Sequence, residues 1–190
     1  MSLRIKIASE PWELEQVYGL NYRTFVEEIP QHSANDERRL IDRRLERSDC
    51  YVCLDGRRLR GMVAICGERP FSLDAKLDDL DSHLPRHERP CEIRLLAVEK
   101  DDRGGQVFAA LMAALVRHSR QRGYDLAVLS GAQSQLRLYR HIGCVPFGPP
   151  LGTEAARYQG MYLTWDRLSP SLLRLAQELA MDGSAEGKES

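Results

Sequence analysis

An apolar run, a short turn with glycines and a long helical pattern follow one another directly in this sequence, and this succession constrains the fold most. The apolar run covers residues 91–98, the turn contains Arg103-Gly104-Gly105, and apolar side chains recur at helical spacing from 107 to 122. The exposed N–H groups of such a turn, together with the positive end of the helix after it, form a binding site for phosphate. The sequence therefore predicts a strand–turn–helix unit that binds a phosphorylated carrier.

Length and charge limit the classes of protein to which the chain can belong. Its 190 residues predict one domain at 1–167, followed by a short helix and a disordered polar tail at 168–190 that would suit a linker. The formal net charge is only −1, so neither nucleic acid nor an anionic membrane is an expected partner. We find no apolar run long enough for a membrane span and no signal-peptide pattern in the first twenty residues. We expect a cytoplasmic protein.

The five cysteines indicate buried free thiols rather than a metal or redox site. Cys53, Cys66 and Cys91 lie in apolar, strand-like runs, and an odd number cannot be fully paired within one chain. Cys50 and Cys53 are spaced as C-x-x-C, but no second pair completes a zinc site. On a strand, residues three apart point to opposite faces.

The order of the expected elements predicts the fold class. The expected strands are 3–8, 50–54, 59–66, 91–98, 125–130, 145–147 and 158–165, and the expected helices are 11–28, 36–47, 107–122, 134–141 and a short one from 168. Asp55-Gly56 suits a hairpin turn, and Gly123 and Gly143 suit helix ends. This order predicts an α/β (α+β) domain with a mixed central sheet of about seven strands and helices on both faces.

The segment 67–90 is long and irregular, with the pattern of a short helix at 73–80. A loop of this length in a compact domain is often functional. Two interpretations remain open: the segment covers a substrate site, or it is a disordered excursion.

Two segments resemble motifs of the GNAT superfamily of N-acyltransferases over residues 3–166. The first is the turn Arg103-Gly104-Gly105. The second, Leu138-Tyr139-Arg140-His141-Ile142-Gly143-Cys144, is similar to the family's "Leu-Tyr-x-x-x-Gly-Phe" segment. The superfamily transfers acyl groups from acyl-coenzyme A or an acyl carrier protein. The resemblance implies donor binding by Leu96, Ala97, Val98, Arg103, Gly104, Gly105, Gln106, Val107 and Phe108.

The turn departs from the family pattern at two positions that are usually small. Gln106 can still donate its backbone N–H, because glycine is required only where φ is positive or a ligand comes very close. The ring of Phe108 either crowds the pyrophosphate or turns into the core. Ala132 and Cys144 replace the asparagine and phenylalanine that the family often has.

Two further segments resemble one branch of the superfamily, the autoinducer synthases and long-chain N-acyl amino acid synthases. The segment Tyr22-Arg23-Thr24-Phe25-Val26-Glu27-Glu28 is similar to their N-terminal "Tyr-Arg-x-Phe-Val-Glu-Glu", and residues 91–98 are similar to their "Glu-x-Ser-Arg-Leu-Ala-Val" strand. That branch loads from acyl carrier proteins. The resemblance implies substrate contacts by Arg23, Phe25 and Arg94. Similar domains joined to a pyridoxal-phosphate enzyme suggest a fused or partner enzyme.

Glu92 is the candidate general base. Regular alternation would place it on one strand face with Arg94, Leu96 and Val98. A primary ammonium, with a pKa of about 10, must lose a proton before it can attack, and a carboxylate can take that proton. The alternatives are an ion pair of Glu92 with Arg94 or with Arg23, or simple exposure at the strand end.

Tyr139 is the candidate general acid. Acyl transfer from a thioester expels a thiolate, which a phenol can protonate, and the resemblance implies this role for Tyr139. The alternative is an amphipathic core tyrosine on a short helix. A backbone N–H near Val98 would hold the developing oxyanion. Among the histidines, His83 and His87 are expected in solvent, His118 on the polar side of its helix, and His141 has no assigned role.

Two classes of function follow. The first is an N-acyltransferase that moves an acetyl or longer acyl group from acyl-coenzyme A, or from an acyl carrier protein, to a primary amine of a small molecule or amino acid. The second is a non-catalytic domain of this fold that senses an acyl carrier or docks a partner enzyme. Gln106, Phe108 and Ala132 favour the second class.

Overall fold

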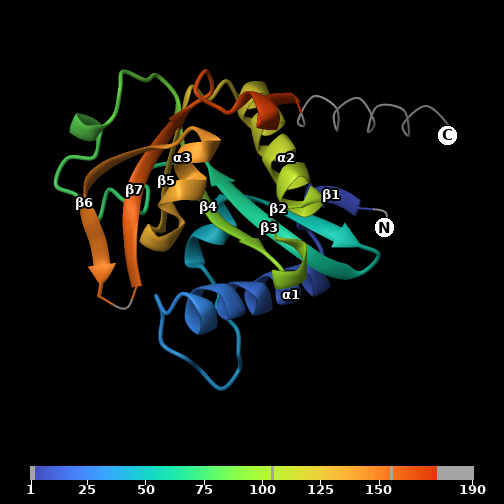
Figure 1. The fold of residues 1–190 in the computed structure, drawn as a ribbon. Coiled ribbons are helices and arrows are strands. Elements are labelled where there is room, and N and C mark those ends of the chain that lie inside the picture. Colours follow the sequence, from blue (N-terminus) through green and yellow to red (C-terminus); the bar gives the residue numbers. More distant parts are fainter. Residues whose placement is uncertain (1–2, 104, 155, 175–190) are drawn as a thin grey trace.

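A computed structural model describes residues 3–103, 105–154 and 156–174, and in this part of the chain seven strands form one mixed sheet (Figure 1). The strands are Leu3–Ile7 (β1), Asp49–Asp55 (β2), Arg58–Cys66 (β3), Pro90–Val98 (β4), Leu126–Ala132 (β5), Val145–Thr153 (β6) and Ala156–Thr164 (β7). Their order is β1-β2-β3-β4-β5-β7-β6. The central pair β4–β5 is parallel and the other pairs are antiparallel. The predicted mixed α/β sheet is therefore confirmed.

Helices cover both faces of the sheet, as predicted. Helix α1 (Pro11–Tyr22) packs on one face, where Val17 and Leu20 join a buried cluster with β2 and β3. Helices α2 (Gln106–Arg122) and α3 (Leu136–Ile142) lie on the other face with the largest apolar cluster (Figure 1). Both of these helices end at a glycine with positive φ, Gly123 and Gly143, because an L side chain is unfavourable there.

The start of α1 is fixed to the first strand through Glu13. This side chain is fully buried and accepts hydrogen bonds from the N–H groups of Ser9 and Glu10, at 2.9 and 3.1 Å. Lys6 of β1 donates to it at 2.9 Å. At its other end α1 continues as a π-helical segment, η1 (Arg23–Glu28), so the predicted helical span to residue 28 is confirmed with a change of helix type.

The predicted second helix at 36–47 is wrong. Only a short 3₁₀ turn, η2 (Arg43–Arg47), forms there, with the Asp42 side chain accepting from the N–H of Arg44 at 2.8 Å. Arg38, upstream, has φ of 50°, which breaks any helix. Alternating charges favour a helix locally, but of the three apolar residues in the segment only Leu45 is buried against the sheet, while Ile41 is 54% exposed.

The segment 67–90 is an ordered layer over the sheet, so the disordered alternative is wrong. Phe71 and Leu73 are fully buried and cluster with Leu126 and Val128 of β5. The predicted helix at 73–80 does not form, and a 3₁₀ turn, η3, lies at Asp81–His83 instead. Strand β6 is longer than predicted because the register shift between Phe147 and Leu151 accommodates Gly-Pro-Pro as a bulge.

The cysteine prediction is confirmed. All five thiols are free and buried. Cys50 and Cys53 point to opposite faces of β2, since they belong to different apolar clusters. Within the described part of the chain, none of the helices has the length and apolar character that crossing a bilayer requires. The short helix predicted from 168 is present at residues 170–174 of the described chain, and the predicted disordered tail at 182–190 lies outside the described residues. The domain boundary at 167 stays a prediction.

Candidate active site

The two central strands diverge where the strand–turn–helix unit begins. Strand β4 pairs with β5 only between Pro90–Ile93 and Leu126–Leu129. Beyond this point residues 94–98 pair with β3 alone, while residues 130–132 pair with β7 alone. The facing edges of β4 and β5 therefore carry backbone groups without a ladder partner, and such groups can bind an extended ligand.

A bulge in β4 lies at the point of divergence. Arg94 pairs with Ala64 and Ala97 with Met62, so two residues of β4, 95 and 96, oppose only Val63 of β3. Leu95 has φ of 53°, a conformation that non-glycine residues rarely adopt. The bulge places Leu95 and Ala97 in the α1 cluster, and Leu96 and Val98 in the α2 cluster.

The predicted shared face of Glu92, Arg94, Leu96 and Val98 is therefore wrong. The extra residue reverses the alternation, so Leu96 and Val98 pack on the side opposite Arg94. The bulge could not be predicted from the local sequence, because neither glycine nor proline marks its position.

The turn after β4 leads into the N-terminus of α2. Within the described part of the chain, the first helical hydrogen bond runs from the N–H of Ala109 to the C=O of Gly105, and the N–H groups of residues 106–108 lie in the first turn, where a helix supplies no acceptor four residues earlier within itself. No acidic side chain lies in this first turn. The half-buried Phe108 ring packs against the core cluster, which decides in favour of the ring turning inward. Gly104 lies outside the described residues.

Ion pairs hold the turn in place. Arg60 of β3 contacts both oxygens of Asp102 at 2.7 Å, and both side chains are largely buried. Arg103 donates to the C=O of Val98 at 3.2 Å and to Glu28 at 2.6 Å. Arg23 pairs with Glu99 at 2.5 Å. The predicted donor residue Arg103 and the predicted substrate residue Arg23 therefore join η1 to the turn, whereas Arg60 and Asp102 were missed.

Tyr139 lies against the diverging end of β5. A Cβ atom on Gly131 would overlap the Tyr139 ring and approach its hydroxyl oxygen to 2.8 Å, so the glycine leaves room for the phenol. Burial, with a smaller effect of Cys144, raises the pKa of Tyr139. A phenol that stays protonated at neutral pH can donate a proton but cannot act as a base.

Glu92 lies before the bulge and is only 2% exposed. Its Oε1 accepts hydrogen bonds from both the N–H of Ser72, at 2.8 Å, and the Ser72 hydroxyl. Its Oε2 lies 3.4 Å from Nη1 of Arg94, whose Nη2 pairs closely with Asp42. The predicted ion pair with Arg94 is present, Arg23 pairs elsewhere, and exposure at the strand end is wrong.

Helix α2 buries a histidine that was predicted to face solvent. Nδ1 of His118 lies 3.0 Å from the Tyr51 hydroxyl, and Nε2 lies 3.5 Å from Asp49. Burial lowers the pKa of His118. The prediction was wrong because α2 packs against β1 and β2, which cover that side of the helix. Among the described residues no group of three or more potential ligands could hold a metal ion.

A family model for the N-acyl amino acid synthase FeeM matches residues 16–164, which include the diverging strands, the turn and α3. The chain belongs to this family. It is therefore a GNAT-type acyltransferase, an enzyme that moves an acyl group to an amine. No curated protein sequence matches the chain.

Solved structures show the same fold as this member of the FeeM family. FeeM from uncultured soil microbes is 15% identical, with 90% of this chain and 97% of that chain covered and a TM-score of 0.68. BjaI, a CoA-dependent acyl-homoserine lactone synthase solved with SAM and isopentyl-CoA, is 22% identical, with 87% and 80% covered and a TM-score of 0.67. A Bacillus subtilis acetyltransferase in complex with CoA is 17% identical, with 86% and 99% covered and a TM-score of 0.54.

The structure gathers most of the predicted site of this FeeM-family enzyme around β4. Leu96, Ala97 and Val98 border the divergence, Gly105 to Phe108 begin α2, and Glu92 and Arg94 lie just before the bulge. Phe25 is half-buried against the α1 cluster. Ser72 and Asp42 were missed, because irregular segments bring them to Glu92 and Arg94 and their sequence neighbourhood carries no periodic signal.

Proposed function

We propose that the enzyme N-acylates the amino group of an amino acid or similar small amine, using a thioester donor bound between β4 and β5. The supporting observation is the divergence of these strands beside the first-turn amides of α2, with Tyr139 packed at the β5 side. Unpaired backbone groups suit the amides of a phosphopantetheine arm, and the helix start suits its phosphate.

The chemistry follows from these positions. The amine nitrogen attacks the thioester carbonyl, and a backbone N–H near Val98 stabilises the oxyanion. Glu92 takes the first proton, which the ammonium must lose before it attacks, and the thiolate that leaves takes the proton of the Tyr139 hydroxyl. The nitrogen loses a second proton as the tetrahedral intermediate collapses, and this proton restores the Tyr139 hydroxyl through solvent. Glu92 releases its own proton to solvent before the next turnover. The products are an amide and a free thiol. Arg94 lies beside Glu92 with its Nη2 paired to Asp42, and its guanidinium is the group that a carboxylate on the acceptor would meet next to the base.

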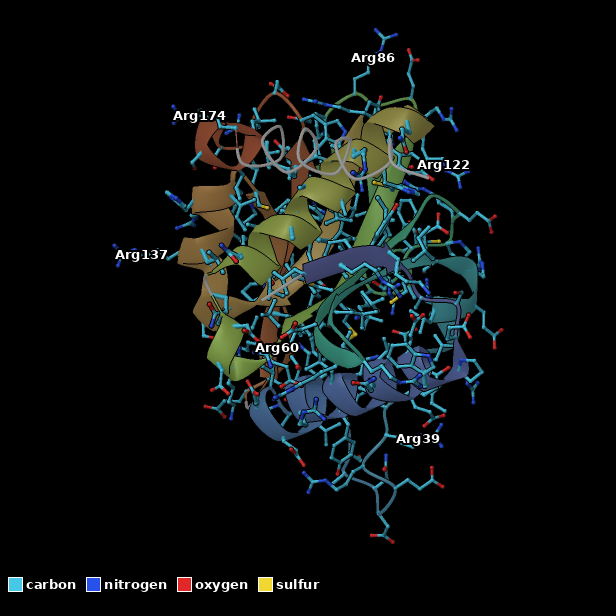
Figure 2. All side chains as sticks on the ribbon, turned by 90° about the vertical axis from the view of Figure 1, so that its right-hand side faces the viewer. Arg39, Arg60, Arg86, Arg122, Arg137 and Arg174 are labelled. Atoms are coloured by element: carbon cyan, nitrogen blue, oxygen red, sulfur yellow. The ribbon has the colours of Figure 1, made fainter. Side chains whose placement is uncertain are left out.

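The donor is an acyl-coenzyme A, acetyl or longer, or an acyl carrier protein, and one surface favours the carrier. Between residues 103 and 153 the chain has six arginines and a single acidic residue, Asp125. The arginines of α2 and α3 are exposed, and Figure 2 shows Arg137 projecting into solvent. Leu138, beside it, is 44% exposed. An acidic carrier bound to α3 would deliver its arm next to Tyr139 on the same helix.

Thiol release with an amino acid mixture tests the function. We expect turnover with octanoyl- and palmitoyl-thioesters, and Tyr139→Phe and Glu92→Gln should each lower kcat about a hundredfold while the thermal unfolding midpoint stays close to that of the wild type. Turnover of no thioester, on either coenzyme A or a carrier protein, would refute the proposal.

Charge reversal tests the carrier surface. Arg137→Glu with Arg140→Glu should raise KM for an acyl carrier protein about tenfold or more, because like charges then face each other, and leave KM for acyl-coenzyme A nearly unchanged. Arg86→Glu, an exposed arginine elsewhere on the molecule (Figure 2), is the matched control. Equal effects of both variants on both donors would count against docking at α3.

A further inference from the structure

Ser72 makes two of the hydrogen bonds to the buried Glu92, both to the same oxygen. Its backbone N–H lies 2.8 Å from Oε1, and its hydroxyl donates to Oε1 as well. Hydrogen bonds to an ionised carboxylate are about twice as strong as those between neutral groups. The pair of donors therefore fixes both the position of the carboxylate and its rotation.

The position of Ser72 is itself rigidly determined. Its neighbours Phe71 and Leu73 are fully buried and anchor the segment 67–90 on β5. Asp74 accepts from the N–H of Phe71 at 2.6 Å and pairs with Arg69 at 2.9 Å, which closes the turn around the serine. Ser72 is thus a polar residue held between two apolar anchors, and its hydroxyl points at a carboxylate from another element.

The two carboxylate oxygens of Glu92 differ in their hydrogen-bond partners. Oε1 is occupied by Ser72, while Oε2 has only Arg94 at 3.4 Å, longer than an ordinary hydrogen bond. Nη2 of Arg94 is committed to Asp42. Oε2 is consequently the carboxylate oxygen that has a lone pair available to accept a proton.

We propose that Ser72 is a positioning residue for acyl transfer, which acts by orienting Glu92 so that Oε2 receives the proton of the amine. The inference rests on the proposed role of Glu92 as the base. It also gives the segment 67–90 a role in catalysis, because this segment carries Ser72, which orients the carboxylate of Glu92.

Ser72→Ala tests this with a small change in volume. We expect kcat to fall about tenfold, because a base displaced by a fraction of an ångström transfers protons less well, while KM for the donor stays within twofold. Ser72→Thr keeps the hydroxyl and should recover most of kcat. Ser82→Ala is the matched control, since Ser82 lies in the same segment and its hydroxyl donates to the C=O of Asp79 instead.

A double-mutant cycle separates this role from a merely structural one. If Ser72 acts through Glu92, Ser72→Ala in a Glu92→Gln background should cause no further loss of kcat. A full tenfold loss in that background, or unchanged kcat in Ser72→Ala alone, would overturn the inference and leave the proposed function standing. A wild-type enzyme that turns over no thioester would refute the proposed function and this inference with it.

Discussion

Gly131→Ala should displace the Tyr139 ring and so impair its proposed role while leaving the tyrosine itself unsubstituted. Gly131 lies on β5 just beyond the last residue paired with β4, and the Tyr139 ring occupies the space where a side chain would be. The new Cβ would come within 2.8 Å of the hydroxyl oxygen and closer still to the ring carbons, compared with an ordinary contact distance of about 3.5 Å. The ring must therefore move by about 1 Å.

The expected cost in catalysis is larger than the cost in stability. Misplacement of a catalytic group by about 1 Å can lower kcat about a hundredfold. Overpacking costs roughly 1–3 kcal/mol, and for a chain of this size that lowers the unfolding midpoint by roughly 2–12 °C. Steady-state thiol release measures the change in kcat, and thermal unfolding of the same preparation measures the change in the unfolding midpoint.

A second glycine of the sheet provides the control. Gly160 of β7 pairs with Ser130, next to Gly131, and a Cβ there would meet the Phe147 ring at 3.1 Å. Gly160→Ala should therefore lower stability slightly and leave kcat close to the wild-type value. In a Tyr139→Phe background, Gly131→Ala should add little further loss. A Gly131→Ala enzyme with wild-type kcat would refute the placement of the general acid against β5.

Two other predictions concern the turn and the buried histidine. Asp102→Asn removes the negative charge that pairs with Arg60 and holds the turn, so KM for the donor should rise about tenfold with little change in kcat. Initial rates over a range of donor concentrations measure KM, and an unchanged KM would contradict the prediction. His118 is surrounded by Tyr51, Asp49, Arg122 and Tyr124, and burial lowers its pKa. The neutral imidazole therefore stabilises the folded state above about pH 6.5, and this contribution is lost as the pH falls below that value. Unfolding midpoints at pH 8 and pH 5.5 should therefore differ more for the wild type than for His118→Gln, and an equal difference would contradict the argument.

The sheet could be predicted because its signals are local. Apolar runs bounded by Asp55-Gly56, Gly123 and Gly143 define strands and helix ends, since each glycine has a positive φ that other residues avoid. The charged run at 36–47 was wrongly predicted as a helix because only one of its apolar residues, Leu45, packs against the sheet, which is too little burial to stabilise a helix there. The position of His118 was wrongly predicted because a polar residue on a helix is expected to be exposed. Its burial becomes clear only when the strands that cover this side of α2 are known.

The candidate site could be predicted only where it rests on sequence motifs. The turn and the segment around Tyr139 predicted a donor side, and in the structure both lie at the divergence of β4 and β5, where the donor is proposed to bind. Ser72 and Asp42 could not be found, because the contacts that make them important span 20 and 52 residues along the chain, to Glu92 and Arg94. Such pairings depend on the whole fold rather than on any local pattern.

The bulge at Leu95 shows how one strand can carry both the proposed base and the backbone proposed to bind the donor. In a regular strand, Leu96 and Val98 would share the face of Glu92, and their apolar side chains would leave the α2 cluster that they now fill. The extra residue lets β4 present Glu92 and Arg94 towards α1 and the segment 67–90, and then return Leu96 and Val98 to the core beneath α2. The bulge lies just beyond the point where β4 stops pairing with β5, so the backbone proposed to bind the donor, residues 94–98, follows the proposed base Glu92 along the strand. The positive φ at Leu95 costs about 1 kcal/mol, and the arrangement that it allows places the proposed base and the proposed donor site a few residues apart on β4.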